Sequence, residues 1–578
     1  MNITIEKNVM VPMRDGVKLA TDIYRPAEGG PFPTLTQRLP YNKETIVMVG
    51  DCFRMAQSGY AVVVQDTRGR FASEGEFNPF FQEPGDGVDT IAWAARQPWS
   101  TGNVGTMGGS YFGATQWLAA REAPEALLAM APNITSADYY ESWTYQGGAF
   151  QLGFILVWTF GYLALPDRQR RLAKGQGTLE ELGMMLHDFD HMSDLYNRLP
   201  LVDVPLLKEV ADYYFDWLAH SSYDDYWRSI APQETYERIT VPAFNIGGWF
   251  DLFLRGTLTN YQGMKKRGGS AIARQHQHLV IGPWSHGFVG GFFPERDFGF
   301  MSGGEIIDLA GMQIRWFDHW VKGVENGVKQ DKPVKLFVMG PNIWREEDDW
   351  PLPDTQFCPY YLRSRGYANS AAGDGTLATE TPGSEPEDVY LYDPRRPVPT
   401  VGGATFLPGL LTGVNAGPRD QRGVEMRDDV LCYSTPPLGR PVEVTGPIEL
   451  VLFVSSSALD TDFTGKLVDV SPDGRAELLT DGILRTRYRA SFSKPVLMEP
   501  GHMYELRVDL GATSNVFQAG HRIRLEVSSS NFPRFDRNTN TGGTIATESE
   551  KDLVQAVNRV YHDSAHPSHL ILPIIERD

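Results

Sequence analysis

The sequence predicts an α/β fold that is interrupted by a helical insertion and followed by an all-β unit. Three changes of pattern along the chain support this prediction. Residues 1–140 alternate strand-like and helix-like segments, residues 141–240 carry helical patterns with almost no strand signal, and strand signals prevail after residue 350. Strand–helix alternation is typical of a mostly parallel sheet, and apolar–polar alternation between turn residues is typical of an antiparallel sandwich.

The first part of the chain supplies the expected sheet and its nearest helices. Runs rich in apolar residues predict strands at 17–26, 60–69 and 102–109. An acidic start and apolar residues at helical spacing predict a helix at 86–97, and a second helix is expected over 114–130.

Long helical patterns define the insertion, and the sheet resumes behind it. Helices are expected at 179–199 and 206–220. Strand signals return at 240–251 and 277–287, and an amphipathic helix follows at 304–324. The insertion therefore divides the α/β domain into two sequence segments.

The C-terminal part reads as strands and turns. Segments 447–457, 505–513 and 521–533 alternate apolar and polar residues between Gly, Pro and Asp clusters, whereas 363–388 is loop-like. The expected boundaries are 1–140 and 241–350 for the α/β domain, 141–240 for the helical insertion and 351–578 for the β-sandwich.

Composition excludes several classes of protein. The 578-residue chain is 42% hydrophobic and 22% charged, as in ordinary globular proteins, and its net charge of −19 opposes nucleic-acid binding. The most apolar segment, 149–166, contains Gln151 and internal glycines, so we expect a buried or site-lining helix and no membrane partner. Cys52, Cys358 and Cys432 are scattered without metal-like spacing, which favours a reducing cytoplasm; we expect no metal, no cofactor and no secretory signal.

The stretch "TMGGSYFGATQ" at 106–116 places three glycines around one serine. Glycine tolerates positive φ and close backbone approach, so the stretch predicts a sharp strand-to-helix turn that holds Ser110 exposed. A serine nucleophile needs a histidine base, and the histidine needs a carboxylate to fix its tautomer. Asp251 and His286 each follow a predicted strand, in the order Ser, acid, His of α/β-hydrolases.

Several stretches resemble the cocaine-esterase-like serine hydrolases, a family grouped with X-Pro dipeptidyl-peptidases and α-amino-acid ester hydrolases. The matching stretches span nearly the whole chain: "RLPYNKE" (38–44), "VVVQDTRGRFASEGEF" (62–77), "GGSYFGATQ" (108–116), "GGWFDLF" (247–253), "IGPWSHG" (281–287) and "SSSALDTDFTGKLVDVSPDGRAELLTDGILRTRYR" (455–489). The resemblance implies an α/β-hydrolase domain with an inserted helical cap, followed by a C-terminal jelly roll.

The resemblance also implies roles for particular residues. The nucleophile, acid and base fall on Ser110, Asp251 and His286, and the oxyanion hole falls on the Tyr41 hydroxyl and the Tyr111 backbone N–H. The implied acyl-pocket residues are Trp143, Trp158 and Phe253, with Phe406 and Leu407 of "TFLPG" (405–409) as a wall from the jelly roll.

An uncharged aromatic or bulky acyl group on a small-molecule ester is the expected substrate. Leu252, Phe253 and Leu254 follow the acid where α-amino-acid ester hydrolases carry carboxylates, although Asp138 and Glu141 are not far off. That activity, with related β-lactam acylase chemistry, and X-Pro dipeptidyl-peptidase activity stay as alternatives. A non-catalytic carbohydrate-binding protein stays open as well, and a homodimer is left open beside a monomer.

Other polar residues have simpler interpretations. His187 and His191 are expected on a solvated helix of the insertion. His562, His566 and His569 are expected at the surface near the C-terminus. Asp66 and Arg68 are expected to form a structural ion pair rather than a catalytic pair, and the Asp-rich 460–474 is expected as strand and turn because it lacks calcium-loop spacing.

Overall fold

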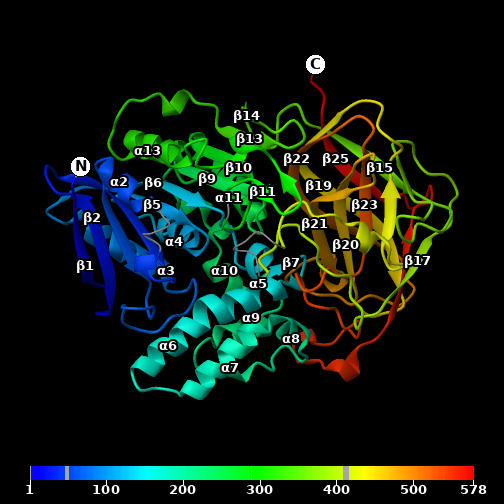
Figure 1. Cartoon of the computed structure of the whole chain (residues 1–578), viewed down its shortest axis with the longest axis horizontal. Coiled ribbons are helices and arrows are strands. Elements are labelled where there is room, and N and C mark those ends of the chain that lie inside the picture. The colour runs from blue at the N-terminus through cyan, green and yellow to red at the C-terminus, as the bar shows by residue number, and fades with distance from the viewer. Residues whose placement is uncertain (1, 46–50, 288, 408–414, 578) are drawn as a thin grey trace.

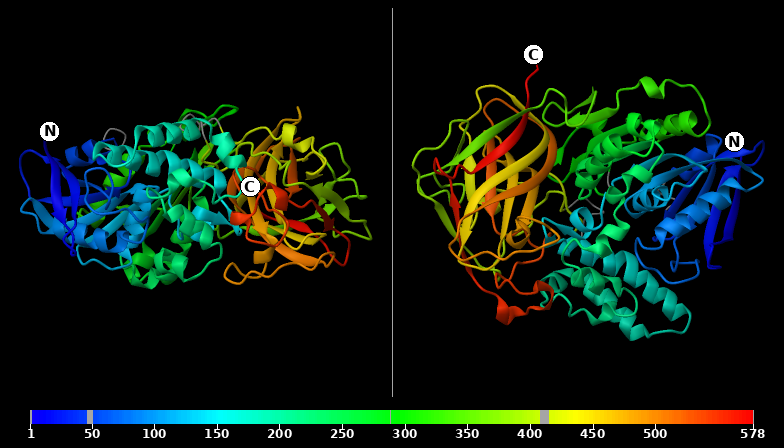
Figure 2. Two further views of the ribbon diagram at one scale, coloured as in Figure 1. Left: turned by 90° about the horizontal axis from the view of Figure 1, so that it is seen from below. Right: turned by 180° about the vertical axis from the view of Figure 1, so that it is seen from behind.

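The computed structural model describes residues 2–45, 51–287, 289–407 and 415–577. Figure 1 shows three parts: an N-terminal α/β part, a group of helices below it, and a C-terminal β-rich part beside both. The two further views in Figure 2 give the same arrangement. In Figure 1 the helices α6 to α9 lie below the two sheet-containing parts, and the three parts meet near the middle of the molecule.

The α/β part is built on a ten-stranded sheet in the order β1-β2-β4-β3-β5-β6-β9-β10-β13-β14. Its central strands, from β4 through β3 to β13, pair in parallel, and antiparallel strands lie at both edges. The strands are β1 (Ile3–Pro12), β2 (Lys18–Pro26), β3 (Phe32–Leu39), β4 (Ala61–Asp66), β5 (Ser100–Gly109), β6 (Leu127–Asn133), β9 (Ala243–Phe250), β10 (Gln277–Ser285), β13 (Val334–Val338) and β14 (Ile343–Glu347).

Helices cover both faces of this sheet, as the alternation of strands and helices predicts. They are α2 (Cys52–Gln57), α3 (Glu83–Ala95), α4 (Tyr111–Ala120), α11 (Leu254–Arg267), α12 (Ala271–Gln275) and α13 (Leu309–Trp320). Strands β5, β9 and β10 are buried along most or all of their length. Their carboxyl ends lie at one edge of the sheet because the strands between them are parallel.

The helix expected over 114–130 is wrong in its second half. Helix α4 ends at Ala120, and β6 occupies Leu127–Asn133. Pro124 cannot continue a helix, and the apolar run after it pairs in parallel with β5. Sheet pairing therefore overrides the helical preference of "EALLAM".

The inserted segment is mostly helical. It contains η1 (Tyr140–Thr144), the short strands β7 (Tyr145–Gln146) and β8 (Ala149–Phe150), α5 (Leu152–Val157), η2 (Trp158–Ala164), α6 (Leu165–Ala173), α7 (Leu179–Asp190), α8 (Met192–Asn197), η3 (Pro205–Leu207), α9 (Tyr213–Ala219), α10 (Asp225–Ile230), η4 (Pro232–Glu234) and η5 (Tyr236–Arg238). The helices expected at 179–199 and 206–220 are each broken, since α7 ends before His191 and α9 begins at Tyr213. Within the described residues, no helix is long and apolar enough to cross a membrane.

The C-terminal part is an eleven-stranded sheet structure in which most pairings are antiparallel. Its strands are β15 (Gln356–Arg363), β16 (Thr376–Ala378), β17 (Asp388–Tyr392), β18 (Leu431–Ser434), β19 (Val442–Ser456), β20 (Asp462–Val470), β21 (Ala476–Arg485), β22 (Tyr504–Phe517), β23 (Arg522–Ser528), β24 (Ala556–Tyr561) and β25 (His569–Ile575). The segment expected to be loop-like, 363–388, holds the short strand β16.

The C-terminal part contacts the inserted segment through buried polar groups. Asp536 accepts a hydrogen bond from the Phe150 N–H at 2.9 Å, and the Arg485 N–H donates to the Gly147 carbonyl at 2.8 Å. Arg485 also forms ion pairs with Asp462 and Asp536 at 2.9 and 2.8 Å. These ion pairs lie within the C-terminal part and fix Asp536 and Arg485, and the bonds from these two residues to Phe150 and Gly147 join the two parts.

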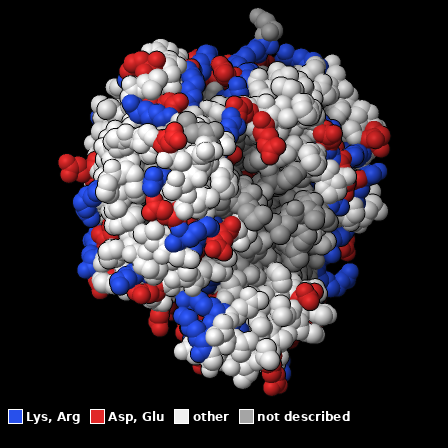
Figure 3. Space-filling model, turned by 60° about the vertical axis from the view of Figure 1, so that its left-hand side comes forward, with Lys and Arg blue, Asp and Glu red and all other residues white. Residues whose placement is uncertain are grey.

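Acidic and basic side chains are interspersed on one face of the molecule (Figure 3). On the face drawn in Figure 3, Asp and Glu lie among Lys and Arg rather than in separate regions. The net charge of −19 is therefore carried by an excess of acidic residues that are mixed with basic ones on this face.

Candidate active site

Ser110 lies at the turn between β5 and α4. Its φ of 56° and ψ of −127° are unusual for a residue with a side chain, and the helix begins at the next residue. Gly108 has φ of +123°, and a Cβ at Gly113 would come within 2.7 Å of Thr135. The glycines therefore permit the sharp turn and the close approach of α4 to the segment after β6.

Ser110, His286 and Asp251 form a chain of hydrogen bonds at the carboxyl ends of β5, β10 and β9. The Ser110 Oγ lies 2.9 Å from His286 Nε2, and His286 Nδ1 lies 2.8 Å from Asp251 Oδ1. His286 and Asp251 are 7% and 1% exposed, so water has little access to this chain. The imidazole thus has a hydroxyl on one nitrogen and a carboxylate on the other, which is the arrangement that activates a serine.

Tyr41, which follows β3, reaches the same place. Its hydroxyl accepts the indole N–H of Trp158 at 2.8 Å and lies near enough to Ser110 for that side chain to affect its pKa. Burial raises the pKa of Tyr41 above its ordinary value, so the hydroxyl keeps its proton. The structure therefore brings a neutral phenol donor next to Ser110.

Tyr111 is the first residue of α4. Backbone N–H groups in the first turn of a helix have no intrahelical acceptor, so the Tyr111 N–H is available at the turn. Its side chain points into the protein, where the hydroxyl donates to Glu83 Oε1 at 2.9 Å and accepts the Phe80 N–H at 2.9 Å. These bonds fix the start of α4.

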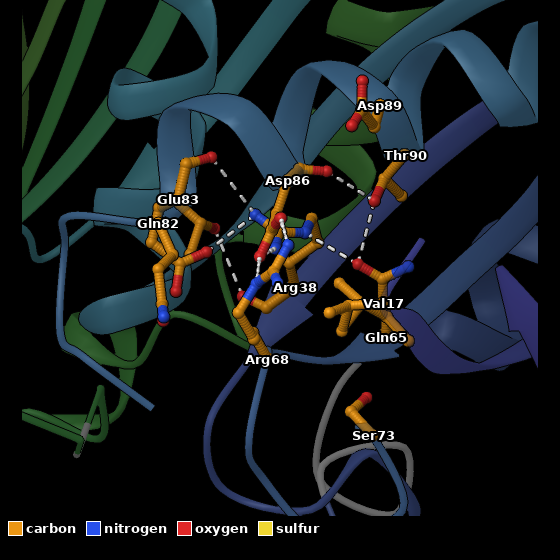
Figure 4. A network of polar contacts seen from close by, with 12 residues as sticks. Val17, Arg38, Gln65, Arg68, Ser73, Gln82, Glu83, Asp86, Asp89 and Thr90 are labelled. Atoms are coloured by element: carbon orange, nitrogen blue, oxygen red, sulfur yellow. Dashed lines mark hydrogen bonds and ion pairs between the residues drawn. The ribbon is translucent and has the colours of Figure 1, made fainter. Parts of the chain in front are cut away.

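A buried ionic network lies around Glu83 (Figure 4). Arg38 donates to Glu83 at 2.7 Å and to Gln65 at 2.8 Å, and Arg68 pairs with Asp86 at 2.6 Å. Burial raises the pKa of Glu83, although the charge of Arg38 opposes this effect. Sequence reasoning missed Arg38 and Glu83, because two charges 45 positions apart carry no local pattern.

The predicted ion pair between Asp66 and Arg68 is wrong. Asp66 accepts the Lys43 N–H at 2.8 Å and lies 3.5 Å from the Lys43 ammonium. Arg68 points instead to Asp86 and to Asp15, which lies 2.7 Å away. Arg68 lies beyond the end of β4 at Asp66, where strand geometry no longer sets the side-chain directions, and the two side chains find separate partners.

Aromatic side chains surround His286 and Ser110. Trp143 stacks on Phe253 with ring centroids 4.2 Å apart, and Phe253 meets the His286 ring edge to face at 5.0 Å. Phe406 of the C-terminal part lies 5.4 Å from His286. Leu407 is buried against Gly153, while Pro408 and Gly409 of "TFLPG" lie outside the described residues.

Both tryptophans of this region lie in π-helical segments. Trp143 belongs to η1 and Trp158 to η2, and the two rings meet at 5.2 Å. π-helical turns are rare and often occur at functional sites. All the residues predicted for the acyl pocket are thus brought together, although Trp158 also has a polar partner in Tyr41.

Two predictions about other histidines have different outcomes. His187 and His191 are exposed on the helical segment, and their rings stack at 4.2 Å. The expectation that His562 is a surface residue is wrong, because His562 is fully buried. Its Nε2 lies 2.9 Å from Asp388 and 3.1 Å from the Ser364 hydroxyl.

Comparison with known proteins assigns the chain to a family. Residues 15–288 match the model of the X-Pro dipeptidyl-peptidases of the S15 family, and residues 326–571 match that of the X-Pro dipeptidyl-peptidase C-terminal non-catalytic domain. The chain is 44% identical over 584 residues to the cocaine esterase of Rhodococcus sp. (strain MB1 Bresler), and the match covers 100% of this chain and 99% of that protein.

Solved structures with similar folds include an aminopeptidase from a marine sediment archaeon, Thaumarchaeota archaeon. It is 26% identical, with a TM-score of 0.82 and coverage of 100% of this chain and 97% of that one. An α-amino-acid ester hydrolase is 25% identical, with a TM-score of 0.80 and coverage of 99% and 97%.

Fold, site and comparisons together define a serine hydrolase with an α/β-hydrolase-like domain and a C-terminal β-rich domain. The chain belongs to the cocaine-esterase-like serine hydrolases, the family that the sequence motifs indicated. It is an enzyme of the serine esterase type, and the family grouping includes the α-amino-acid ester hydrolases as relatives.

Proposed function

We propose that the protein hydrolyses carboxylic esters with Ser110 as nucleophile, His286 as general base and Asp251 as the carboxylate that orients His286. The observation that carries this proposal is the hydrogen-bond chain from Ser110 through both nitrogens of His286 to Asp251. The turn conformation of Ser110 and the start of α4 behind it support the same assignment.

The reaction would follow the two steps of acyl transfer. Ser110 Oγ attacks the acyl carbon while its proton passes to His286 Nε2, and the carbonyl oxygen becomes an oxyanion that accepts hydrogen bonds from the Tyr41 hydroxyl and the Tyr111 N–H. His286 then gives the proton to the leaving alcohol, and an acyl-enzyme remains. Water, deprotonated by His286, releases the acid and restores Ser110.

The acyl group that this site fits is uncharged and aromatic or bulky. Trp143, Trp158, Phe253, Phe406 and Leu407 offer apolar surface around Ser110 and His286. Aromatic walls suit flat apolar groups because binding buries apolar surface of the wall and of the ligand, and because the rings stack favourably.

The carboxylates of Asp138 and Glu141, which the sequence places not far from the site, are already bound by other groups of the protein. Glu141 lies 3.0 Å from Arg255 and accepts the Gly147 N–H, and Asp138 accepts the N–H groups of Tyr140 and Glu141. Burial raises the pKa of Glu141 to about 8 and that of Asp138 to about 6. Both carboxyls are thus occupied by groups of the protein and are not free to bind a substrate ammonium, which disfavours an α-amino-acid ester hydrolase activity.

The finer architecture is part of this proposal. We take 1–140 and 241–350 as the α/β-hydrolase domain, 141–240 as its cap and 351–578 as a jelly roll; the antiparallel pairing of the C-terminal strands supports the last assignment. The free thiols of Cys52, Cys358 and Cys432 support a cytoplasmic location.

Labelling with a fluorophosphonate probe tests the nucleophile directly. The wild type should react, and Ser110→Ala should not; a carbohydrate-binding protein without activity would leave both unlabelled. A panel of esters tests the acyl group. Benzoyl and phenylacetyl esters should be hydrolysed about ten- to hundredfold faster than phenylglycine methyl ester, because burial of an unpaired ammonium is costly. The reverse preference would favour the amino-acid ester hydrolase alternative.

A further inference from the structure

Among the described residues, the indole N–H of Trp158 has one polar partner, the hydroxyl oxygen of Tyr41 at 2.8 Å. An indole N–H can only donate, so the Tyr41 oxygen must accept this bond. The single proton of the Tyr41 hydroxyl is then directed elsewhere. The Ser110 side chain, which is near enough to affect the pKa of this hydroxyl, is a group toward which that proton can point.

Ser110 fits the acceptor role. Its own proton points to His286 Nε2 at 2.9 Å, and His286 Nδ1 is held by Asp251 at 2.8 Å. The bond from Trp158 to Tyr41 and the bond from Ser110 to His286 therefore leave the Tyr41 proton and a Ser110 lone pair free for each other or for a developing oxyanion. The indole of Trp158 cannot accept a hydrogen bond, so the direction of its bond to Tyr41 cannot be reversed.

Arg70 connects the segments that carry Tyr41 and Trp158. Its guanidinium donates to the carbonyl of Pro40, the residue before Tyr41, at 3.0 Å. It also donates to the carbonyls of Leu163 and Tyr162 at 2.9 and 3.1 Å, in the π-helical segment that begins at Trp158. Pro166 has no N–H, so the Tyr162 carbonyl four residues earlier lacks its usual helical donor and is open to Arg70.

Burial makes these contacts persistent. Arg70 and Trp158 are each only 2% exposed. Trp217 stacks behind Trp158 with ring centroids 5.7 Å apart and an interplanar angle of 6°, which fixes the plane of the indole. The N–H of Trp158 is thus aimed at Tyr41 by packing on one side and by Arg70 on the other.

We propose that Trp158 is a positioning residue of the reaction, which acts by orienting the Tyr41 hydroxyl proton toward Ser110 and the developing oxyanion. This inference rests on the proposed function of Ser110 and Tyr41. It differs from the acyl-pocket role that the sequence resemblance implies, because an orienting role depends on the N–H and not on the apolar area of the ring.

The test replaces Trp158 with β-(3-benzothienyl)alanine, which keeps the shape of the indole and exchanges only the N–H for sulfur. Loss of one orienting hydrogen bond should lower kcat about tenfold. KM should change less than about twofold, since the oxyanion gains more from Tyr41 than the ground-state carbonyl does. The loss should be equal for p-nitrophenyl acetate and p-nitrophenyl benzoate. The same replacement at Trp217 is the matched control and should leave kcat unchanged.

A double-mutant cycle with Tyr41→Phe completes the experiment. In that background the Trp158 replacement should have no further effect on kcat, because the hydroxyl it orients is absent. Trp158→Phe is a second variant for the same test. Its loss of kcat should be smaller in the Tyr41→Phe background than in the wild type. The proposal is overturned by an unchanged kcat, by a loss confined to the benzoate with a raised KM, or by a loss that persists with Tyr41→Phe. Failure of the proposed function itself is distinct, since Ser110→Ala would then keep its activity.

Discussion

Two clusters of serine, histidine and aspartate lie among the described residues, one in each sheet-containing part. In the first, Ser110 and Asp251 contact different nitrogens of His286. In the second, Ser364 and Asp388 both face Nε2 of His562, at 3.1 and 2.9 Å. We refer to them as the Ser110 cluster and the Ser364 cluster.

The difference lies in where the serine proton goes. The Ser364 hydroxyl also lies 2.8 Å from both oxygens of Asp388, and Tyr433 donates to the same carboxylate at 2.7 Å. The Ser364 hydroxyl therefore donates its hydrogen bond to a carboxylate and not to the histidine. The side chains of Ser364, Asp388 and His562 are all buried. Ser110 instead occupies a turn at the head of a helix. The same three residue types thus give a structural cluster in one place and a candidate active site in the other.

The largest expected difference between the clusters is in turnover. Ser110→Ala should lower kcat by about four orders of magnitude or more while the melting temperature stays near that of the wild type. Ser364→Ala should keep kcat and lower the free energy of unfolding by about 1.5–3 kcal/mol, because a bond to a buried carboxylate is lost. Ester assays and urea unfolding of both variants check this pair. Near-normal turnover in Ser110→Ala would end the assignment.

The tyrosine beside each cluster allows a second comparison. Tyr41→Phe should lower kcat roughly 10²–10³-fold, since it removes one proposed oxyanion donor and keeps the ring. Tyr433→Phe removes the hydroxyl that donates to Asp388, so it should lower the free energy of unfolding and leave kcat unchanged. Steady-state kinetics with chemistry shown to be rate-limiting measures the effect. We would abandon the role of Tyr41 if its variant kept more than about a third of kcat.

The pH dependence of activity should follow the Ser110 cluster alone. A protonated His286 cannot accept the serine proton, so kcat/KM should fall toward acid pH, by about tenfold per pH unit in the limiting region. His562→Gln should leave this profile unchanged, because His562 is buried in the other part of the molecule. A rate that is flat from pH 5 to 9 would contradict the role of His286.

The smallest expected effect is on the acid stability of the Ser364 cluster. Burial alone would raise the pKa of Asp388, but hydrogen bonds from His562, the Ala368 N–H and Tyr433 bring it below its ordinary value. Because the folded-state pKa is lowered, Asp388 stabilises the fold above pH ~4 and loses this contribution as the pH falls further. The difference in unfolding free energy between wild type and Asp388→Asn should therefore narrow from pH 5 to pH 3 in urea titrations. A difference that stayed constant would exclude this linkage.

The order Ser110, Asp251, His286 could be found in the sequence because each residue follows a strand of a parallel sheet. Carboxyl ends of such strands share an edge, so residues far apart in the chain meet there. The contacts of Arg70 could not be found in this way. Its acceptors are main-chain carbonyls, which every residue type supplies equally, so no pattern marks them.

Local pattern failed where tertiary pairing decides the outcome. The segment "EALLAM" suits a helix, but its last residues form the strand β6 between β5 and β9. His562 stands 174 positions from Asp388, and a histidine near a chain end reads as a surface residue. Asp388 begins β17 and His562 follows β24, so the pairing of these two strands brings the two residues together. Both side chains are buried as a result.

The π-helical segment at 158–164 has a consequence for how this family can change its length. A π turn closes its hydrogen bonds from i to i+5, one residue more than an α turn, so the segment stores an extra residue between α5 and α6. Loss of a single codon here would let the helix close as a regular α-helix with both neighbours still in place. The scaffold would survive such an evolutionary deletion, but the carbonyls of Tyr162 and Leu163 would no longer be presented to Arg70. A one-residue deletion in this segment would therefore keep the fold and lose the contacts that position the proposed active-site residues.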